Sequence, residues 1–402
     1  MKYITVLADG MADLPLDELD GRTPLEAADV PNINGISGSS LTGIAYTIPE
    51  GMEPGSDVAN LSVLGYDPGS YYAGRSGIEA AGMGLQLGQD DIALRTNLLT
   101  LRYGNSYESS VMIDHGADDI TSDEAFILLS AIRDQFADDN ISFFNGTSYR
   151  HLMVLSGQKN TFRLTPPHDI LNKTIYTYLP KGKGSKLLKD MMKKSYDILS
   201  GHYVNMSRIN RGLNPANSMW FWGAGAKTSI PSFRSYYGKE GGVISAVNLV
   251  KGIGRLSGME VIEVEGADGT INTNYKGKVQ ACLTGLKRGL DFIYLHIEAP
   301  DECGHKGDLK EKIRSIELID RMVIGPLLES AGETGRFRLM LLSDHPTPVS
   351  LRTHTSGPVP FMIYDSGQVY KGPGIFCEKS AASSGLVFKD GCELLPFFLS
   401  DK

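Results

Sequence analysis

The hydrophobic pattern of the chain contains four short apolar runs, each about the length of one buried strand. They read YITVLA, FIYLHI, RLMLLS and PFMIYD and begin at residues 3, 292, 338 and 360. Unbroken apolar runs of this length are typical of strands that are covered on both faces in a parallel sheet. An aspartate closely follows each of the first three runs: Asp9, Asp301 and Asp344. Because ligands gather at the carboxyl edge of such a sheet, the pattern predicts a site there.

Stretches with helical spacing of apolar residues lie between these runs. Residues 245–258 (SAVNLVKGIGRLSG) and 310–330 (KEKIRSIELIDRMVIGPLLES) have this spacing and predict helices. Strands that alternate with helices indicate an α/β fold. We therefore predict a mostly parallel sheet flanked by helices.

The middle of the chain has a second strand-and-helix pattern, in which acidic residues at strand ends are only weakly indicated. Its clearest amphipathic helix spans residues 185–202. The expected inner face of that helix consists of Leu188, Met191, Met192, Ile198 and Leu199.

A chain of 402 residues exceeds the usual size of one core, so two domains are expected. We predict that residues 73–214 form a domain inserted into an outer domain made of residues 1–72 and 215–402. The run SMWFWGAG, with Trp220 and Trp222, is expected to be the strand that returns to the outer domain.

The overall composition is that of a globular enzyme, with 41% hydrophobic and 21% charged residues. The net charge of −8 argues against a nucleic-acid partner, because phosphates need basic residues to neutralise them. The four cysteines form no Cys-x-x-Cys pair, as is typical of reduced thiols in the cytoplasm. The N-terminus lacks the pattern of a signal peptide, and no apolar run approaches the ~18–20 residues of a membrane span. We therefore expect a cytoplasmic enzyme without a membrane partner.

Aspartate and histidine residues recur after the predicted strands, and a serine lies in the turn-forming sequence PGSD. The complete set is Asp9, Ser56, Asp301, His305, Asp344, His345 and His354. Aspartate together with histidine suits divalent ions such as Mn²⁺ or Zn²⁺, whereas carboxylates alone would favour Mg²⁺ or Ca²⁺. The Asp and His ligands exceed the needs of one tetrahedral ion, so the set predicts two ions. Two ions can clamp an in-line phosphoryl displacement, and one of them can activate a serine hydroxyl.

Each of these residues also has a structural interpretation. Ser56 precedes an apolar stretch that reads as a short helix, so it can be the N-cap rather than a nucleophile. Asp301 and His305 are four residues apart, but two nearby glycines favour a loop over a helix face. His296, inside an apolar strand, and Cys303 are expected to be packed residues rather than ligands. Only the combination of aspartates at strand ends with the histidines that follow indicates a site.

Longer motifs carry a family resemblance over residues 8–361. In chain order they are ADGMAD with LDGRTPLEAADVPNI, PGSDVANLSVLGYDP, YYAGRSGIEAAG, YRHL, PPHD, HIEAPDECGHKGD and SDHPTPVSLRTHTSGPVPF. In these motifs the chain resembles the cofactor-independent phosphoglycerate mutases of archaeal type, within the alkaline phosphatase superfamily. The resemblance implies an alkaline-phosphatase-like sheet with a smaller inserted α/β domain.

The resemblance also implies a glycolytic isomerase that interconverts 3- and 2-phosphoglycerate through a phosphoserine and needs no bisphosphoglycerate. Ser56 would accept the phosphoryl group. One ion would be held by Asp9, Ser56, Asp344 and His345, and the other by Asp301, His305 and His354. Mn²⁺ is the expected metal, with Zn²⁺ or Mg²⁺ as alternatives. Related bacterial chains have been assigned as homoserine kinases, so transfer to homoserine or another small hydroxyl acceptor stays open.

The family binds a small phosphorylated hydroxy acid between its two domains. The matching residues here are Arg75, Arg150, His151, His168, Asp169 and, more loosely, Lys239. Arginine forks suit a carboxylate and a phosphate, and a histidine–aspartate pair suits general acid–base catalysis. Two positions depart from the family pattern: Asn60 replaces a common histidine and Glu298 a common lysine. We expect neither to contact a proposed ligand, and the sequence leaves the oligomeric state open.

Overall fold

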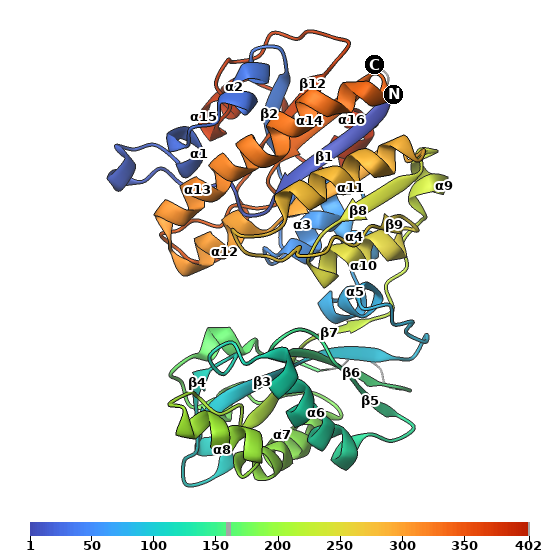
Figure 1. Ribbon diagram of the computed structural model, residues 1–402. Coiled ribbons are helices and arrows are strands. Elements are labelled where there is room, and N and C mark those ends of the chain that lie inside the picture. Colours follow the sequence, from blue (N-terminus) through green and yellow to red (C-terminus); the bar gives the residue numbers. More distant parts are fainter. Residues whose placement is uncertain (158–161, 401–402) are drawn as a thin grey trace. The chain divides into compact units, whose positions relative to one another are not determined.

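The chain folds into two compact units, each with its own sheet (Figure 1). The computed structural model describes residues 1–157 and 162–400. The outer unit comprises Met1–Tyr72 and Ser229–Lys402, and the inserted unit comprises Ala73–Thr228. The first boundary lies where the sequence predicts it.

The second boundary differs from the predicted one. Strand β7 (Ser218–Ala226) pairs antiparallel with β3 (Ile92–Arg102), the longest strand of the inserted sheet. Residues 215–228 therefore belong to the inserted unit, and the expectation that Trp220 and Trp222 return to the outer domain is wrong. The physical reason is that a buried apolar run does not encode which of two sheets it will join.

An eight-stranded sheet forms the centre of the outer unit. In spatial order its strands are β13 (Val387–Phe388), β2 (Leu41–Ala45), β12 (Val359–Asp365), β11 (Phe337–Leu342), β1 (Lys2–Ala8), β10 (Phe292–Ile297), β8 (Gly241–Ile244) and β9 (Glu260–Val261). Strand β1 pairs in parallel with both β10 and β11, whereas β12 is antiparallel to β11 and β2. The predicted α/β class with a mostly parallel sheet is confirmed.

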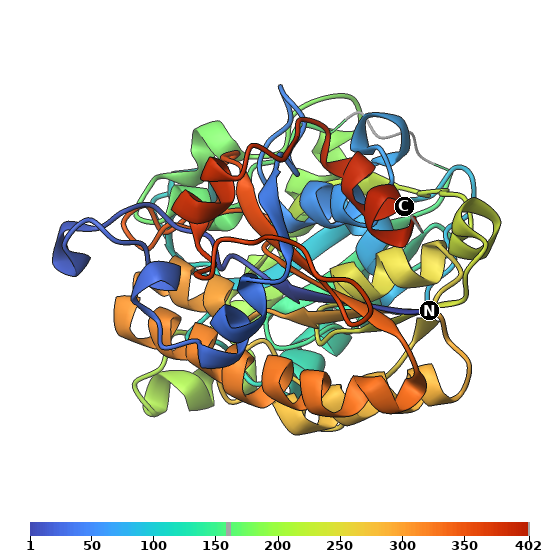
Figure 2. The same ribbon diagram turned by 90° about the horizontal axis from the view of Figure 1, so that it is seen from above.

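Helices cover both faces of this sheet (Figure 2). Alternate residues of β1 point to opposite faces. Ile4 and Val6 join a core with residues of one set of helices, whereas the ring of Tyr3 meets Phe398 on the other side. The first set is α2 (Pro31–Ser37), α11 (Tyr275–Lys287), α13 (Leu309–Ile319) and α14 (Gly325–Ser330). The second set is α3 (Ser56–Val63), α10 (Asn248–Leu256) and α16 (Leu394–Leu399).

The two predicted helices of the outer unit are present. The stretch at 245–258 contains α10, and the stretch at 310–330 contains α13 and α14, joined by a π-helical turn at Asp320–Ile324. Shorter helices of this unit are α1 (Pro24–Ala27), α4 (Pro68–Tyr71), α9 (Phe233–Tyr237), α12 (Ala299–Lys306) and α15 (Glu378–Ser383). Across the described residues, no helix combines the length and apolar character needed to cross a membrane.

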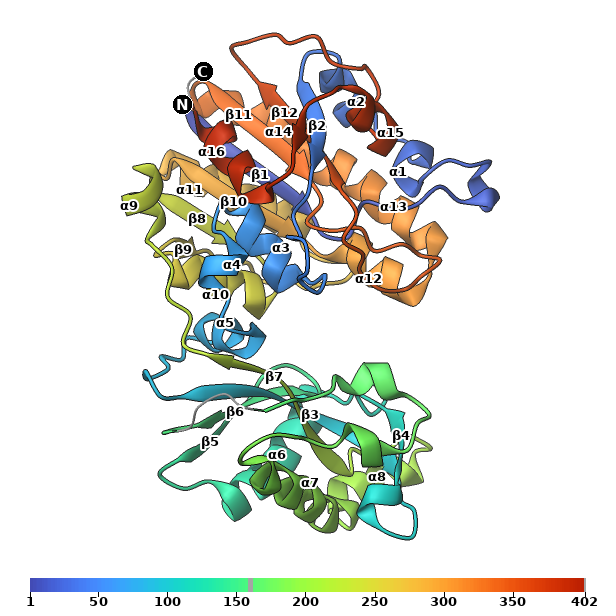
Figure 3. The ribbon, with the colours of Figure 1, turned by 180° about the vertical axis from the view of Figure 1, so that it is seen from behind.

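An antiparallel sheet forms the centre of the inserted unit (Figure 3). Its strands follow the order β4 (Val111–Asp114), β3, β6 (Arg150–Leu155) and β5 (Ile141–Phe144), and β7 also pairs with β3. Helices α6 (Ser122–Phe136), α7 (Ser185–Ser200) and α8 (Tyr203–Asn210) lie on one face, and α5 (Arg75–Gly82) packs on the other. The predicted inner face of α7 is confirmed, because four of its five residues are buried and Ile198 is partly buried against the same core.

We expect Leu188→Ala to lower the free energy of unfolding of the inserted unit by about 2–5 kcal/mol, because it leaves a cavity in the core. Leu188 is fully buried, whereas its neighbour Leu187 is 42% exposed. Leu187→Ala is the matched control and should change the stability by less than ~0.5 kcal/mol. Both tryptophans of the chain lie on β7, so urea denaturation followed by tryptophan fluorescence measures this unit. Equal losses in the two variants would contradict the packing of α7.

Candidate active site

Three neighbouring strands of the outer unit end at the same edge of the sheet. In β1, Ala8 lies beside Ile297 of β10, and Leu7 lies beside Leu342 of β11. The segments that follow these strands therefore meet, and they carry the three predicted aspartates. The edge that the sequence predicts as a ligand site is the place where these carboxylates collect.

Asp9, Asp344 and His345 form a first group of potential metal ligands, and all three are buried. One ligand atom from each lies within 4.8 Å of the other two. The carboxylate of Asp344 accepts hydrogen bonds from the backbone N–H groups of Gly10 at 3.1 Å and His345 at 2.9 Å. Asp9 Oδ1 is buried and makes no hydrogen bond with the described residues. A buried carboxylate oxygen without a donor, beside two further ligand atoms, fits a cation.

Ser56 lies next to this first group. Its Oγ is 3.2 Å from His345 Nε2. Ser56 is the first residue of α3, and Gly55 occupies the N-cap position without a side-chain cap. The structure therefore does not show Ser56 as the N-cap. Its hydroxyl is at a helix N-terminus, where backbone N–H groups favour negative charge.

Asp301, His305 and His354 form a second group. Asp301 and His305 lie one turn apart on α12, with 3.3 Å between Oδ2 and Nε2. His354 Nε2 is 3.4 Å from Asp301 Oδ1 and 2.9 Å from His305 Nε2. The loop expected around Asp301 and His305 is wrong. Gly307, with a φ of 69°, ends the helix in the left-handed conformation instead of preventing it.

The pKa values of Asp9 and Asp301, one from each group, shift in opposite directions. Burial, followed by the charges of Asp344 and Asp301, raises the pKa of Asp9 well above its usual value. Burial alone would also raise the pKa of Asp301, but hydrogen bonds with His305 and His354 hold it well below its usual value. A cation in each group would favour the ionised carboxylates. The donor sets and the orphaned Oδ1 of Asp9 therefore fit two divalent ions.

His296 contacts the first group, which the sequence does not indicate. Its Nε2 is 2.9 Å from Asp9 Oδ2, and its Nδ1 is 3.2 Å from Ser245 Oγ. Burial lowers the pKa of His296 to about 3, so the ring is neutral at physiological pH. His296 is the buried strand residue that the sequence predicts, and it also orients Asp9.

Asn60 corrects an expectation from the sequence. Its Nδ2 donates to Asp344 Oδ2 at 3.0 Å and to the carbonyl oxygen of Ser56 at 2.8 Å. Its Oδ1 accepts from the hydroxyl of Tyr294 at 2.7 Å. The expectation that Asn60 does not contact a proposed ligand is wrong, because α3 packs against β10 through this side chain. The contact was not visible in the sequence, since Asp344 is 284 residues away.

Basic and aromatic side chains lie close together in the inserted unit. Arg75 and Arg95 both pair with Glu79, at 2.9 and 3.2 Å. The guanidinium of Arg95 lies 4.2 Å from the centroid of the Trp222 ring. Burial lowers the pKa of Arg95 to about 10, which still leaves it charged at neutral pH. Arg95 was not predicted, and its signal was a charge inside the apolar run IALRTNLLTL.

Further side chains join Arg75, Arg95 and Trp222 through contacts between aromatic rings. His168 lies 5.3 Å from Trp222 and 6.1 Å from His115, and His115 lies 5.5 Å from Tyr149. Arg150 donates to the Tyr149 hydroxyl at 2.8 Å. We call this set the basic cluster: Arg75, Glu79, Arg95, His115, Tyr149, Arg150, His168 and Trp222. It brings together three of the predicted substrate residues, and Asp169 lies next to it, 3.8 Å from His168.

Two predicted substrate residues lie elsewhere. His151 follows Arg150 on β6, so the two side chains point to opposite faces of the sheet; Arg150 is exposed and His151 is buried. Lys239 lies 4.8 Å from the ring centroid of Tyr3. Tyr3 is near the start of β1, whereas the ligand groups follow its end. His151 therefore lies on the other face of the sheet from Arg150, and Lys239 lies near the opposite end of β1 from the ligand groups.

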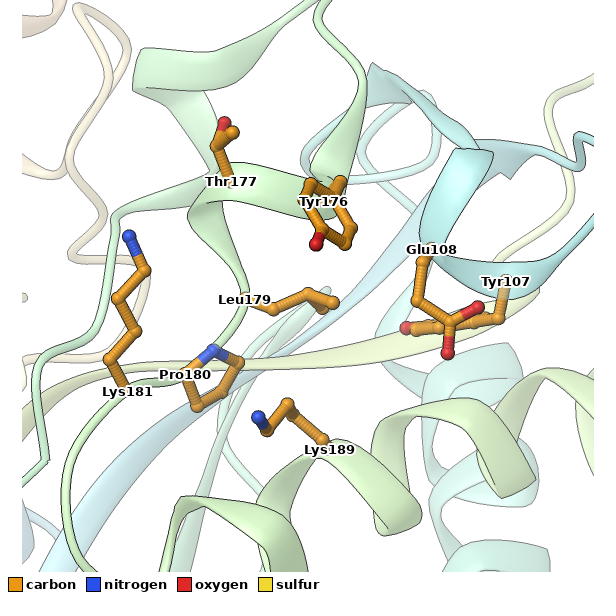
Figure 4. Close-up of a pocket in the computed structure, with 8 residues that line it drawn as sticks. All are labelled: Tyr107, Glu108, Tyr176, Thr177, Leu179, Pro180, Lys181 and Lys189. Carbon is orange, nitrogen blue, oxygen red and sulfur yellow. The ribbon is translucent and has the colours of Figure 1, made fainter.

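A separate cavity of about 420 Å³ opens on the inserted unit (Figure 4). Tyr107 and Glu108 border one side, and Lys189 of α7 borders another. The remaining lining residues are Tyr176, Thr177, Leu179, Pro180 and Lys181. This cavity shares no residue with the basic cluster and contains none of the residues predicted from the sequence.

Known proteins resemble the chain over its full length. The profile of a family described as 2,3-bisphosphoglycerate-independent phosphoglycerate mutase matches residues 38–205. A protein of that name from Methanothrix thermoacetophila is 45% identical and covers 100% of both chains. The chain belongs to this family. A relative from Geobacter sulfurreducens, named a probable phosphoglycerate mutase of the same type, is 45% identical over 99% of this chain and 100% of its own.

Solved structures agree with the assignment to the phosphoglycerate mutase family. A Pyrococcus horikoshii protein matches 100% of this chain and 98% of its own, with a TM-score of 0.82 and 29% identity. A cofactor-independent phosphoglycerate mutase from Thermoplasma acidophilum matches 100% of both chains, with a TM-score of 0.62 and 27% identity.

We expect acid to destabilise the inserted unit of this mutase-family protein through His151. Burial lowers the pKa of His151 from 6.5 to about 3, so between these values the unfolded chain binds a proton that the folded unit does not. Stability therefore falls as the pH drops through this range, by about 2 kcal/mol for this group at about pH 5. Urea denaturation followed by tryptophan fluorescence, near neutral pH and at about pH 5, should show this loss. The loss should be smaller by that amount in His151→Leu, and an identical loss in both proteins would contradict the expectation.

Proposed function

We propose that this protein interconverts 3- and 2-phosphoglycerate without bisphosphoglycerate, through a phosphoserine at Ser56. The observation that carries the proposal is the position of the Ser56 hydroxyl, 3.2 Å from His345 Nε2 and beside a group of buried aspartate and histidine ligands. Family membership supports the choice of substrate, because full-length relatives are named for this reaction. The proposed setting is glycolysis in the cytoplasm.

We propose one divalent ion for each ligand group, with Mn²⁺ as the expected metal. Mixed carboxylate and imidazole ligands suit Mn²⁺ or Zn²⁺ better than Mg²⁺. One ion would be held by Asp9, Asp344, His345 and Ser56, and the other by Asp301, His305 and His354. When bound, the ions would lower the pKa of the serine hydroxyl and offset the charge of the transferred phosphoryl group.

The protein's own groups hold the nucleophile in place. Asn60 donates to the carbonyl of Ser56 and to Asp344, which ties the first turn of α3 to the first ligand group. The backbone N–H groups at the start of a helix have no carbonyl partner within it, so they favour a negative charge at the N-terminus of α3. The start of α3 therefore supplies both the hydroxyl and part of the stabilisation of a phosphoryl group.

The basic cluster is the proposed binding site for the charged groups of the substrate. The cluster holds three guanidinium groups: Arg75 and Arg95 pair with the carboxylate of Glu79, and Arg150 contacts Tyr149. Guanidinium groups bind phosphates and carboxylates through paired hydrogen bonds. His168 is the proposed general acid–base for the glycerate hydroxyls. A mutase must also exclude water while the phosphoserine exists, because hydrolysis would release phosphate.

Ser56→Ala should abolish the interconversion, with a loss of roughly 10⁴-fold or more in kcat, because the nucleophile is gone. Ser62→Ala is the matched control on the same helix, since the Ser62 hydroxyl is buried and makes no hydrogen bond with the described residues. The assay uses 3-phosphoglycerate without added bisphosphoglycerate, and mass spectrometry should find phosphoserine at Ser56 only in proteins that turn over. Full activity of Ser56→Ala would refute the mechanism.

The same proteins separate the proposed reaction from its alternatives. Turnover of homoserine with ATP, but not of 3-phosphoglycerate, would assign a kinase that uses the same serine. Steady release of phosphate from 3-phosphoglycerate would instead assign a phosphatase.

Arg95→Met should raise the KM for 3-phosphoglycerate by about 10–100-fold, because charge-assisted hydrogen bonds of this kind contribute roughly 1.5–3 kcal/mol. Arg102→Met is the control, since Arg102 is exposed at the end of the same strand. Circular dichroism checks that both variants fold. An unchanged KM in a folded Arg95→Met protein would exclude Arg95 from the substrate site.

A further inference from the structure

We propose that Thr347 is a positioning residue that couples the two ligand groups through its single hydroxyl. Its Oγ1 lies 2.5 Å from Asp301 Oδ1 and 3.2 Å from His345 Nδ1. Asp301 belongs to the second ligand group and His345 to the first. One side-chain oxygen therefore contacts a ligand of each group. This inference rests on the proposed two-ion function.

The two hydrogen bonds have one consistent direction. An ionised Asp301 can only accept, so Thr347 donates its proton to Oδ1. The Thr347 oxygen can then only accept from His345, whose Nδ1 must carry a proton. In a neutral imidazole this leaves the lone pair on Nε2. His345 Nε2 is the atom that lies 3.2 Å from Ser56 Oγ and 3.3 Å from Asp344 Oδ2.

The surroundings of Thr347 hold it in this position. It is fully buried, its N–H donates to the carbonyl of Ala12 at 3.2 Å, and its carbonyl accepts from Lys312 Nζ at 2.8 Å. Lys312 is also fully buried and pairs with Asp13 at 2.7 Å. Removing one partner of a buried ion pair leaves an uncompensated charge, so this arrangement resists displacement. The backbone of Thr347 is therefore fixed independently of its hydroxyl.

Two glycines leave room for the Thr347 bridge, by which we mean the two hydrogen bonds of Thr347 Oγ1 with Asp301 and His345. A Cβ on Gly10, whose φ is 61°, would lie 2.6 Å from Asp301 Oδ1 and 2.7 Å from Thr347 Oγ1. A Cβ on Gly304 would lie 2.4 Å from the Thr347 carbonyl oxygen. Only glycine at these two positions allows the segment after β1 and helix α12 to approach Thr347 this closely.

The bridge has a measurable consequence for ion binding. Without the hydroxyl, the Nδ1 proton of His345 loses its acceptor and Asp301 Oδ1 loses a donor. Hydrogen bonds that orient metal ligands typically account for about 10–100-fold in metal affinity. Because both groups lose a partner at once, both ions should bind more weakly.

Mn²⁺ binding to the metal-free full chain tests the coupling without reference to activity. Electron paramagnetic resonance of free Mn²⁺ should show two binding sites in the native protein and a weakening of both by about 10–100-fold in Thr347→Val. Thr347→Ser keeps the hydroxyl and should restore the native affinities. Thr5→Val is the matched control, because Thr5 is fully buried and its hydroxyl makes no hydrogen bond with the described residues. It should bind both ions as the native protein does.

The outcomes separate this inference from the proposed function. Weakening of only one site in Thr347→Val, or of neither, would overturn the coupling. A native protein that binds no ion would overturn the two-ion function itself. If Thr347→Val does not fold, long-range ¹H–¹⁵N spectra of the metal-free native protein, labelled at histidine, decide the question. They should show the proton of His345 on Nδ1, and a proton on Nε2 would refute the bridge.

Discussion

The parallel pairing of β1 with β10 on one side and β11 on the other is the constraint on which the candidate site depends. This register makes three segments leave the sheet at one edge and so places three carboxylates close together in the interior. Carboxylates this close repel one another and raise the pKa of Asp9. Backbone N–H groups, an asparagine and several histidines offset part of that repulsion. A bound cation in each group would offset the remaining repulsion. The clustering of carboxylates at this edge of the sheet is therefore the physical reason to expect the proposed ions.

The two units carry opposite chemistry. The outer unit concentrates carboxylates and imidazoles around a serine hydroxyl, as phosphoryl transfer requires. The inserted unit concentrates guanidinium groups and aromatic rings, which suit the carboxylate and phosphate of a small acid. Neither chemistry is sufficient for a mutase, because the reaction needs both a phosphoryl acceptor and a means of retaining the rest of the substrate. The insertion of one unit into the other keeps both in one chain.

Four of the eight strands of the outer sheet, and the seven residues proposed here as ligands, could be predicted from the sequence, because apolar runs and the polar residues that follow them are local features. The errors have a common physical origin. The family resemblance offers His151 together with Arg150 through the motif YRHL, yet adjacent residues of a strand face opposite sides. Gly307 suggests a loop, yet it ends a helix that carries two of the proposed ligands. The family resemblance offers Lys239 only loosely, and a motif does not specify the sheet edge at which a residue lies. The apolar run of β7 predicts a strand but not its partner strand.

Local pattern is therefore sufficient for the α/β class, the four central apolar strands of the outer sheet and the residue types of the proposed site. The residues that hold those side chains in place could not be found in this way. Asn60, His296 and Thr347 each act through hydrogen bonds to residues far away in the chain, and Arg95 contacts Trp222 on the neighbouring strand β7. The direction of each such bond depends on which donors and acceptors are buried beside it, and burial is a property of the packed chain rather than of any segment. The sequence therefore determines which residue types form the site. The orientation of their side chains and the coupling of the two ligand groups arise only when the strands pair.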